Sequence, residues 1–284
     1  MKYDISIIIS HYISSDSKLK NPLKKTLQTI NDQIKNFNVE IIIADDGSDY
    51  SNCIVENHSE KINIQSDERD IYFLKDKKLI HFLSENNLNY SVIKKWVYLP
   101  KLKQCMSKAR VMNYATKLSK ANNILFLDDD NYLISKNSIK NTIELFKKYN
   151  FIIGQIKDNN NRLRKYNSYR VQGTTIGLNK KLFTDINGLG EWTEEFSCGI
   201  DSDLWIKLYN YFQKNQNLKA CFTDKLSTFD SYSKRWKKFT KFLQDFKLKR
   251  KFNALYKCKN YKSFKLNPSR NKKLWIENLI NEQI

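Results

Sequence analysis

The sequence has few of the residues that break a chain into turns or cross-link it. Its 284 residues include only 7 glycines and 3 prolines, which argues against an extended disordered chain. Five cysteines are scattered without C-x-x-C spacing, and their odd number favours neither a zinc cluster nor a disulfide framework. These shortages predict a folded protein of a reducing compartment.

Long apolar runs are also missing. The run Ile5 to Ile9 follows Asp4 and is far shorter than a signal-peptide core or a membrane span of about 20 residues. We therefore expect a cytoplasmic protein, or one that lies peripherally at a membrane.

What the sequence does contain is apolar runs rich in β-branched residues, which predict buried strands at residues 5–9, 39–44, 123–127 and 151–156. Helical spacing of apolar residues over 21–37 separates the first two. A similar pattern over 135–149, with Ser135 or Ser138 as N-cap, separates the last two. Another helix is expected over 103–122. This order predicts an α/β fold with a mostly parallel sheet.

Acidic residues follow two of these strands. "ADDGSD" (44–49) comes after the second and "DDDN" (128–131) after the third, so both clusters should lie at one edge of the sheet, where ligands bind. Carboxylates spaced D-x-D can reach one Mg²⁺ or Mn²⁺. Each cluster also has a purely structural explanation, because Asp, Asn and Gly form turns and cap helices.

A further acidic pair lies in "CGIDSDLWIKL" (198–208). Its apolar spacing predicts a helix that begins near Asp201 and places Asp201 and Asp203 in the first turn. The pair could favour the helix dipole and cap the helix, or one carboxylate could be a general base.

The order of these motifs resembles that of the family 2 glycosyltransferases, nucleotide-sugar enzymes with the GT-A fold. The matching stretches lie between roughly residues 4 and 210: "ISIIISHY", "VEIIIADDGSD", "SKARVMNYATKLSKANNILFLDDDN" and "QGTTIGLNKKLFTDINGLGEWTEEFSCGIDSDLWIKL". The resemblance implies a Rossmann-like, mostly parallel sheet flanked by helices, and an inverting transfer of sugar from a UDP-sugar to an acceptor hydroxyl.

The resemblance also assigns roles to residues. It implies that Asp46 binds the nucleobase, that Lys108 and Arg110 lie near the nucleotide, and that Asp201 is the catalytic base. The segment 172–177 would line the donor sugar. Asp128 and Asp130 would hold Mn²⁺ or Mg²⁺ as the cofactor. The full donor-binding set is Ser10, His11, Asp46, Lys108, Arg110, Asp128 and Asp129.

Two departures from the family pattern affect this assignment. Ile200 stands where the family usually has Glu, which leaves Asp203 as an alternative base, and the distance from Asp46 to Asp128 implies an insertion within 51–100. The expected enzyme is a hexosyl- or N-acetylhexosaminyltransferase acting on a glycan, polysaccharide, lipid-linked or protein acceptor. The rival hypotheses are a nucleotidyltransferase that uses the same acidic edge, and a non-enzymatic nucleic-acid or membrane-binding protein on a decayed transferase fold.

The positive charge is concentrated at the end of the chain. Of the net charge of +20, residues 225–284 carry +13, from 17 Lys and Arg against 4 Asp and Glu. We expect a GT-A catalytic domain over 1–225 and a basic, aromatic-rich, mainly helical extension over 226–284. The extension could pack on the domain as a lid, or bind an anionic membrane where lipid-linked acceptors reside. Nucleic acid is not an expected partner, because no recognised module accompanies the basic residues.

Overall fold

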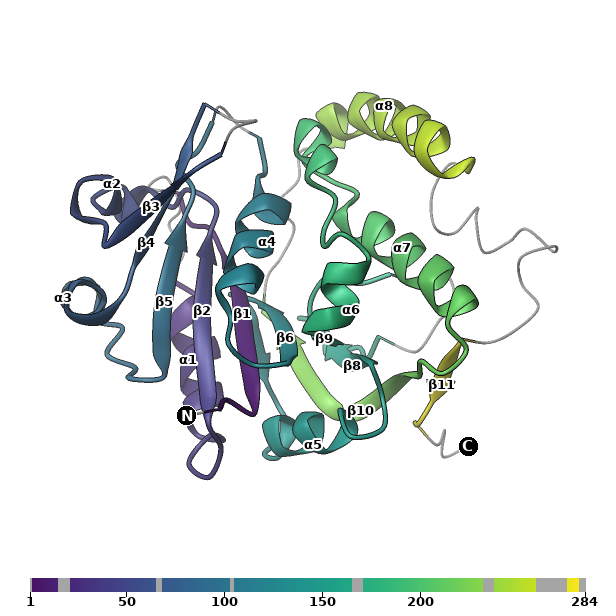
Figure 1. Ribbon diagram of the computed structural model, residues 1–284, viewed down its shortest axis with the longest axis horizontal. Helices are drawn as coiled ribbons and strands as arrows, with labels where there is room; N and C mark the ends of the chain where they lie inside the picture. The colour runs from purple at the N-terminus through teal and green to yellow at the C-terminus, as the bar shows by residue number, and fades with distance from the viewer. Residues whose placement is uncertain are drawn as a thin grey trace.

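The computed structural model describes residues 2–14, 21–64, 68–102, 105–164, 171–231, 238–258 and 275–280, without the side chains of 238–244. Within these residues one mixed sheet crosses the molecule in the order β11-β10-β8-β9-β6-β1-β2-β5-β4-β3 (Figure 1), and β7 pairs with β10. The strands are β1 Ile5–His11, β2 Val39–Asp45, β3 Glu60–Asn63, β4 Asp70–Leu74, β5 Ile93–Tyr98, β6 Asn123–Asp128, β7 Asn131–Leu133, β8 Phe151–Lys157, β9 Ile176–Asn179, β10 Ala220–Asp230 and β11 Ile276–Asn278.

The helices of the described residues are α1 Leu23–Asn31, α2 Ile54–Asn57, α3 Asp76–Glu85, α4 Lys108–Leu118, α5 Ser138–Leu145, α6 Lys180–Asp185, α7 Ile200–Lys214 and α8 Lys238–Tyr256. Two 3-10 helices, η1 Asp49–Ser51 and η2 Glu191–Phe196, lie next to the acidic motifs. The four predicted strands are confirmed as β1, β2, β6 and β8. The prediction of the α5 N-cap was wrong: Asn137 occupies that position, and Ser138 is the first helical residue.

The centre of the sheet is parallel, as predicted. β1 pairs in parallel with β2 and β6, and β2 with β5. The strands β6 and β8 are not neighbours, however, because β9 lies between them and is antiparallel to both. Antiparallel β3 and β4 extend the other edge. The α/β prediction is confirmed, and the sheet is more mixed than the strand-helix-strand pattern indicates.

Successive side chains of the central strands point to opposite faces of the sheet, which divides the core into two layers. Ile8 and Ile42 pack on one face with α4, whereas Ile7, Ile9 and Ile41 pack on the other with α1. Each of these strands is buried on both faces, which explains why its sequence is a continuous apolar run. Helices α4, α6 and α7 cover the first face; α1, α3 and α5 cover the second.

The segment 51–100, predicted to contain an insertion, forms α2, β3, β4, α3 and β5. Strand β5 ends just before Pro100, and the stretch ahead of it contains both β4 and α3. Trp96 of β5 is fully buried between the sheet and α3, and its ring lies 5.0 Å from that of Phe82.

The C-terminal residues continue the fold. The predicted boundary after residue 225 falls inside β10, and β11 pairs in parallel with β10. Trp275 packs edge-on against Phe212, with ring centroids 5.1 Å apart. Helix α8 lies across η2 and the beginning of α7 (Figure 1), with Phe252 of α8 only 1% exposed. Trp236 lies outside the described residues.

Candidate functional site

The two acidic clusters meet at one edge of the sheet because β1 lies between the strands that carry them. Ser10 is in register with Asp128, and His11 is in register with Asp45. The main-chain N–H groups of Asp46 and Asp129 donate to the carbonyl oxygens of His11 and Ser10, at 2.9 and 3.0 Å. The predicted common edge is therefore present, and the end of β1 ties both clusters together.

The first cluster is both a turn and a site. Asp45 supplies the turn: its carboxylate accepts hydrogen bonds from the Ser48 N–H at 2.8 Å and from the Trp96 indole at 3.0 Å. Gly47 has φ +81°, which residues with a side chain rarely adopt. A Cβ at this position would also lie only 2.7 Å from the main-chain nitrogen of Lys101, so there is no space for a side chain. The turn thus leaves Asp46 to face the α4 side of the edge.

The Asp46 carboxylate is buried but well supplied with donors. The main-chain N–H of Ser107 lies 3.0 and 3.1 Å from its two oxygens, and the Lys101 ammonium lies 2.9 Å from Oδ2. Burial raises the pKa of Asp46 to about 6, although Lys101 and the Ser107 N–H oppose the shift. A carboxylate held by donors in this way can also accept hydrogen bonds from a planar, donor-bearing ligand.

The second cluster divides its three carboxylates among different partners. Asp128 accepts a hydrogen bond from Ser10 Oγ and forms an ion pair with the Lys108 ammonium from the first turn of α4. Burial opposes the charge on Lys108, but the carboxylates of Asp128, Asp201 and Asp130 hold the pKa of Lys108 above its ordinary value. One ammonium thus stabilises three acidic side chains that come from two separate motifs.

Asp129 points the other way, into the protein. It is 2% exposed and lies 2.7 Å from His11 Nδ1, while His11 Nε2 contacts the Tyr50 hydroxyl at 2.8 Å. His11 and Asp129 belong to the predicted donor-binding set, and here they form a buried link between β1, the loop after β6 and η1.

Asp130 completes the D-x-D. It is 8% exposed, and its Oδ1 accepts a hydrogen bond from the Asn131 amide at 2.8 Å. Among the described residues, no group of three or more His, Cys, Asp or Glu side chains could hold a metal ion by itself. One or two carboxylates together with substrate phosphates are, however, a common ligand set for Mg²⁺. Binding of an ion by Asp128 and Asp130 together with a diphosphate stays a prediction.

Asp201 lies in the first turn of α7 and faces this cluster. It does not cap the helix, because Gly199 is the N-cap residue. Its Oδ1 packs so closely on Gly173 that a Cβ there would lie 2.0 Å away. Burial raises the pKa of Asp201 against the attraction of Lys108. The alternative base, Asp203, is fully buried in contacts with Trp192, Lys207 and Tyr256.

The segment 172–177 positions the parts around this cluster. The Asp128 N–H donates to Thr174 Oγ1 at 2.8 Å, and the Trp205 indole of α7 donates to the Gln172 carbonyl at 2.9 Å. This segment therefore connects the D-x-D with the helix that carries Asp201, on the side where the donor sugar was predicted.

Arg110 has a different environment from Lys108. Its Nε donates to Glu194 Oε2 at 3.2 Å, and its Nη1 lies 3.3 Å from Glu191 Oε2. Glu194, Ser107 and Lys101 also contact the site residues, although none of them was predicted to do so. The position of Ser107 directly before Lys108 offered the only local signal, since the contacts of Glu194 span 84 or more positions along the chain.

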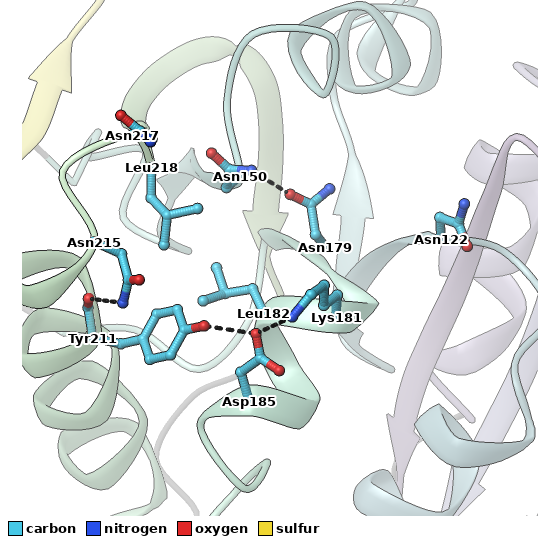
Figure 2. A pocket seen from close by; sticks show the side chains of 10 residues that line it. All are labelled: Asn122, Asn150, Asn179, Lys181, Leu182, Asp185, Tyr211, Asn215, Asn217 and Leu218. Atoms are coloured by element: carbon cyan, nitrogen blue, oxygen red, sulfur yellow. Dashed lines mark hydrogen bonds and ion pairs between the residues drawn. The ribbon is translucent and has the colours of Figure 1, made fainter.

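A pocket lies at the opposite end of the central strands. It has a volume of about 590 Å³, and Figure 2 shows asparagines around it, with Tyr211 and Lys181 both pointing to Asp185. The Asn150 amide donates to Asn179 at 2.8 Å, and Tyr211 donates to Asp185 at 2.6 Å. Asn122 on its wall precedes β6, whereas Asp128 ends that strand, so the pocket contains none of the predicted site residues.

Comparisons with known proteins agree on fold rather than on sequence. No protein-family model matches the chain, and no curated protein matches it. Among solved structures, Staphylococcus aureus TarS 1-349 in complex with UDP-GlcNAc has a TM-score of 0.51 at 14% identity, over 83% of this chain and 60% of that one. Its UDP complex has a TM-score of 0.50 at 14% identity, over 90% and 72%.

TarS itself has a TM-score of 0.50 at 16% identity, over 90% of this chain. This chain spans only 44% of the TarS chain and 60% of the 1-349 fragment in the UDP-GlcNAc complex. Among the described residues, no helix combines the length and the apolar character that crossing a membrane requires. The likeness confirms the predicted architecture: this chain has the GT-A fold.

Proposed function

We propose that this protein is an inverting glycosyltransferase of family 2 that transfers a sugar from a UDP-sugar to an acceptor hydroxyl. The observation that carries the proposal is the ion pair of Lys108 with Asp128 at the same sheet edge as Asp46, with the Asp201 carboxylate packed against Gly173 of the adjoining segment. The UDP-GlcNAc complex of TarS makes UDP-GlcNAc the first donor to test.

In this proposal Asp46 accepts hydrogen bonds from the nucleobase. Its carboxylate is oriented in advance by the Ser107 N–H and Lys101, so little ordering remains to be done when the donor binds. Ser10, Asp128 and Lys108 surround the diphosphate. The remaining residues of the predicted donor-binding set would support these groups from inside the protein. They are His11 and Asp129, which contact each other, and Arg110, which contacts Glu194.

Two cationic elements would stabilise the leaving diphosphate. Lys108 supplies a fixed positive charge from α4. Asp128 and Asp130 would hold Mn²⁺ or Mg²⁺, which when bound adds Lewis-acid stabilisation of the negative charge that develops on UDP. Because Lys108 and the two carboxylates neighbour each other, the site can be neutralised in part before the donor arrives.

Asp201 is the proposed general base. Its raised pKa makes its carboxylate a stronger proton acceptor than an exposed aspartate, and it lies in the same cluster as the diphosphate ligands. It would take the acceptor proton while the acceptor oxygen attacks the anomeric carbon. A single displacement inverts the configuration at that carbon and requires no covalent sugar intermediate.

The test is release of UDP from UDP-GlcNAc and other UDP-sugars, with Mn²⁺ and a panel of glycan, lipid-linked and peptide acceptors. Asp201→Asn should lower kcat by about 10² to 10⁴ with KM for the donor nearly unchanged. Asp130→Ala should abolish the Mn²⁺-dependent part of the rate. The exposed Asp224→Asn is the matched control. Absence of UDP release by the wild type from every donor would refute the proposal.

The proposal also includes an anionic membrane surface as the place where a lipid-linked acceptor is met. The outer side of α8 exposes Phe246 (59%) and the basic residues Lys247, Arg250 and Lys251, close to the η2 and α7 elements of the site. Phe246→Ser should weaken sedimentation with phosphatidylglycerol vesicles, whereas Ile80→Ser, at a 68% exposed position on α3, should not. Equal loss in both variants would contradict this part.

A further inference from the structure

A buried ionic cluster lies directly behind Asp46 and is separate from the carboxylates around Lys108. Its centre is Glu194 of η2, which is 13% exposed at its side chain. Glu194 Oε1 forms an ion pair with Arg69 Nη2 at 2.5 Å and accepts a hydrogen bond from Ser107 Oγ, while Oε2 accepts from Arg110 Nε. Three elements that lie far apart in the sequence thus meet on one carboxylate.

Ser107 connects this cluster to Asp46. Its main-chain N–H donates to both oxygens of Asp46, and its hydroxyl donates to Glu194 and accepts from Arg69 Nη1 at 3.0 Å. Ser107 is the N-cap residue of α4, where a serine hydroxyl would ordinarily bond to the helix. It makes no such cap here. The hydroxyl is instead turned away from α4 toward the Glu194 carboxylate.

Arg69 connects the cluster to the second partner of Asp46. Its Nη1 also donates to the Pro100 carbonyl at 3.2 Å, and the next residue is Lys101, whose ammonium binds Asp46. Both donors of Asp46, the Ser107 N–H and the Lys101 ammonium, therefore belong to segments attached to the same Arg69–Glu194 pair. Arg69 lies directly before β4, within the segment 51–100 that was predicted to contain an insertion.

The charge on Glu194 makes it a strong hydrogen-bond acceptor for these segments. Although burial acts against it, the hydrogen bonds from Ser107 and Arg69 hold the pKa of Glu194 below its ordinary value, so the group stays ionised at neutral pH. A charged acceptor makes stronger hydrogen bonds than a neutral one, and removing a partner from a buried charged network is costly.

We infer that Glu194 is a positioning residue for the donor nucleotide: through Ser107, and through Arg69 and Pro100, it sets the direction in which Asp46 presents its carboxylate to the nucleobase. The inference rests on the proposed function of Asp46. The contacts of Glu194 reach Asp46 only through these segments, so its effect should appear in recognition of the nucleoside part of the donor and not in the chemical step.

Glu194→Gln tests this inference, with Glu195→Gln as matched control. Glu195 is the exposed neighbour and the substitution is identical. Binding of UDP and of inorganic pyrophosphate is measured by calorimetry with Mn²⁺, and KM and kcat are measured with UDP-GlcNAc. Glu194→Gln should raise the Kd for UDP and the KM about tenfold, with kcat changed less than twofold and the Kd for pyrophosphate, which lacks a base, unchanged.

Ser107→Ala provides a second route, because it removes the hydroxyl but keeps the N–H that binds Asp46. If Glu194 acts through Ser107, the double variant should lose less UDP affinity than the product of the two single losses. Losses that multiply, or a pyrophosphate affinity that falls as much as that of UDP, would overturn the inference. So would an unchanged UDP affinity in Glu194→Gln. Absence of UDP binding by the wild type would instead overturn the proposed function, and this inference with it.

Discussion

The raised pKa of Asp46 predicts that the wild-type residue costs stability at neutral pH. Its pKa is about 6 in the folded protein and 3.8 ordinarily, so the folded protein binds this proton more tightly than the unfolded chain does. The ionised group therefore destabilises the fold by about 3 kcal/mol above pH 6, and this cost disappears as the pH falls below 3.8. The attraction of Lys101 is already part of that balance.

Asp46→Asn removes the ionisation while keeping the shape of the side chain. At pH 7.5 it should raise the free energy of unfolding by up to about 3 kcal/mol, which is about 5 °C in Tm for a chain of 284 residues. At pH 4 the gain should be about 0.5 kcal/mol, because the wild-type carboxyl is then mostly protonated when folded. The same variant should bind UDP more weakly, which is the usual conflict between stability and a functional charge.

The assay is thermal unfolding of wild type and Asp46→Asn at pH 7.5 and at pH 4, with Asp224→Asn as control. Asp224 is exposed on β10, so burial cannot raise the cost of its charge, and its substitution should change Tm little at either pH. A variant that is less stable than wild type at pH 7.5, or a Tm difference that is the same at both pH values, would show that burial does not dominate at Asp46.

Three further substitutions test the other contacts. Tyr256→Phe should lower the free energy of unfolding by about 1 to 3 kcal/mol and make α8 more sensitive to limited proteolysis, because the buried Asp203 loses a donor. Asp129→Asn should cost about 1 to 3 kcal/mol in chemical denaturation, since it disturbs a buried hydrogen bond with His11. Gly173→Ala should lower kcat for UDP release with a nearly unchanged donor KM and far-UV circular dichroism, because the new Cβ displaces the Asp201 carboxylate.

The central strands and the common acidic edge could be predicted because they depend on local pattern. A strand buried on both faces must be apolar throughout, and β1, β2 and β6 have such sequences; the carboxyl ends of parallel strands then bring Asp46 and Asp128 to one edge. Asp201 was predicted on the first turn of α7 for the same reason, since the apolar spacing after it fixes where the helix begins.

What could not be predicted depends on contacts between distant segments. β9 lies between β6 and β8, and the sequences of β6 and β8 contain no signal that predicts this strand order. Glu194 is at the centre of an ionic cluster because it pairs with Arg69, a residue 125 positions away in the sequence. The functional difference between Asp201 and Asp203 was also open in the sequence. Their contacts differ, because Tyr256, which comes from another helix, donates to Asp203; which of the two is the base stays a prediction.

The crowding of Asp128, Asp129 and Asp130 is tolerated for reasons that differ from residue to residue. Asp129 turns inward to His11, Asp128 is paired with the Lys108 ammonium, and Asp130 accepts a hydrogen bond from the Asn131 side-chain amide, so each of the three charges has a cationic or donor partner from the chain itself. The triplet alone therefore does not require a divalent ion. It follows that a metal bound by Asp128 and Asp130 must compete with Lys108, and the diphosphate is the component that can change that competition, because it brings oxygen ligands for the metal and a new anionic partner for the ammonium. If Asp128 and Asp130 bind the metal as proposed, we therefore expect cooperative binding, in which the nucleotide raises the affinity for the metal and the metal raises the affinity for the nucleotide.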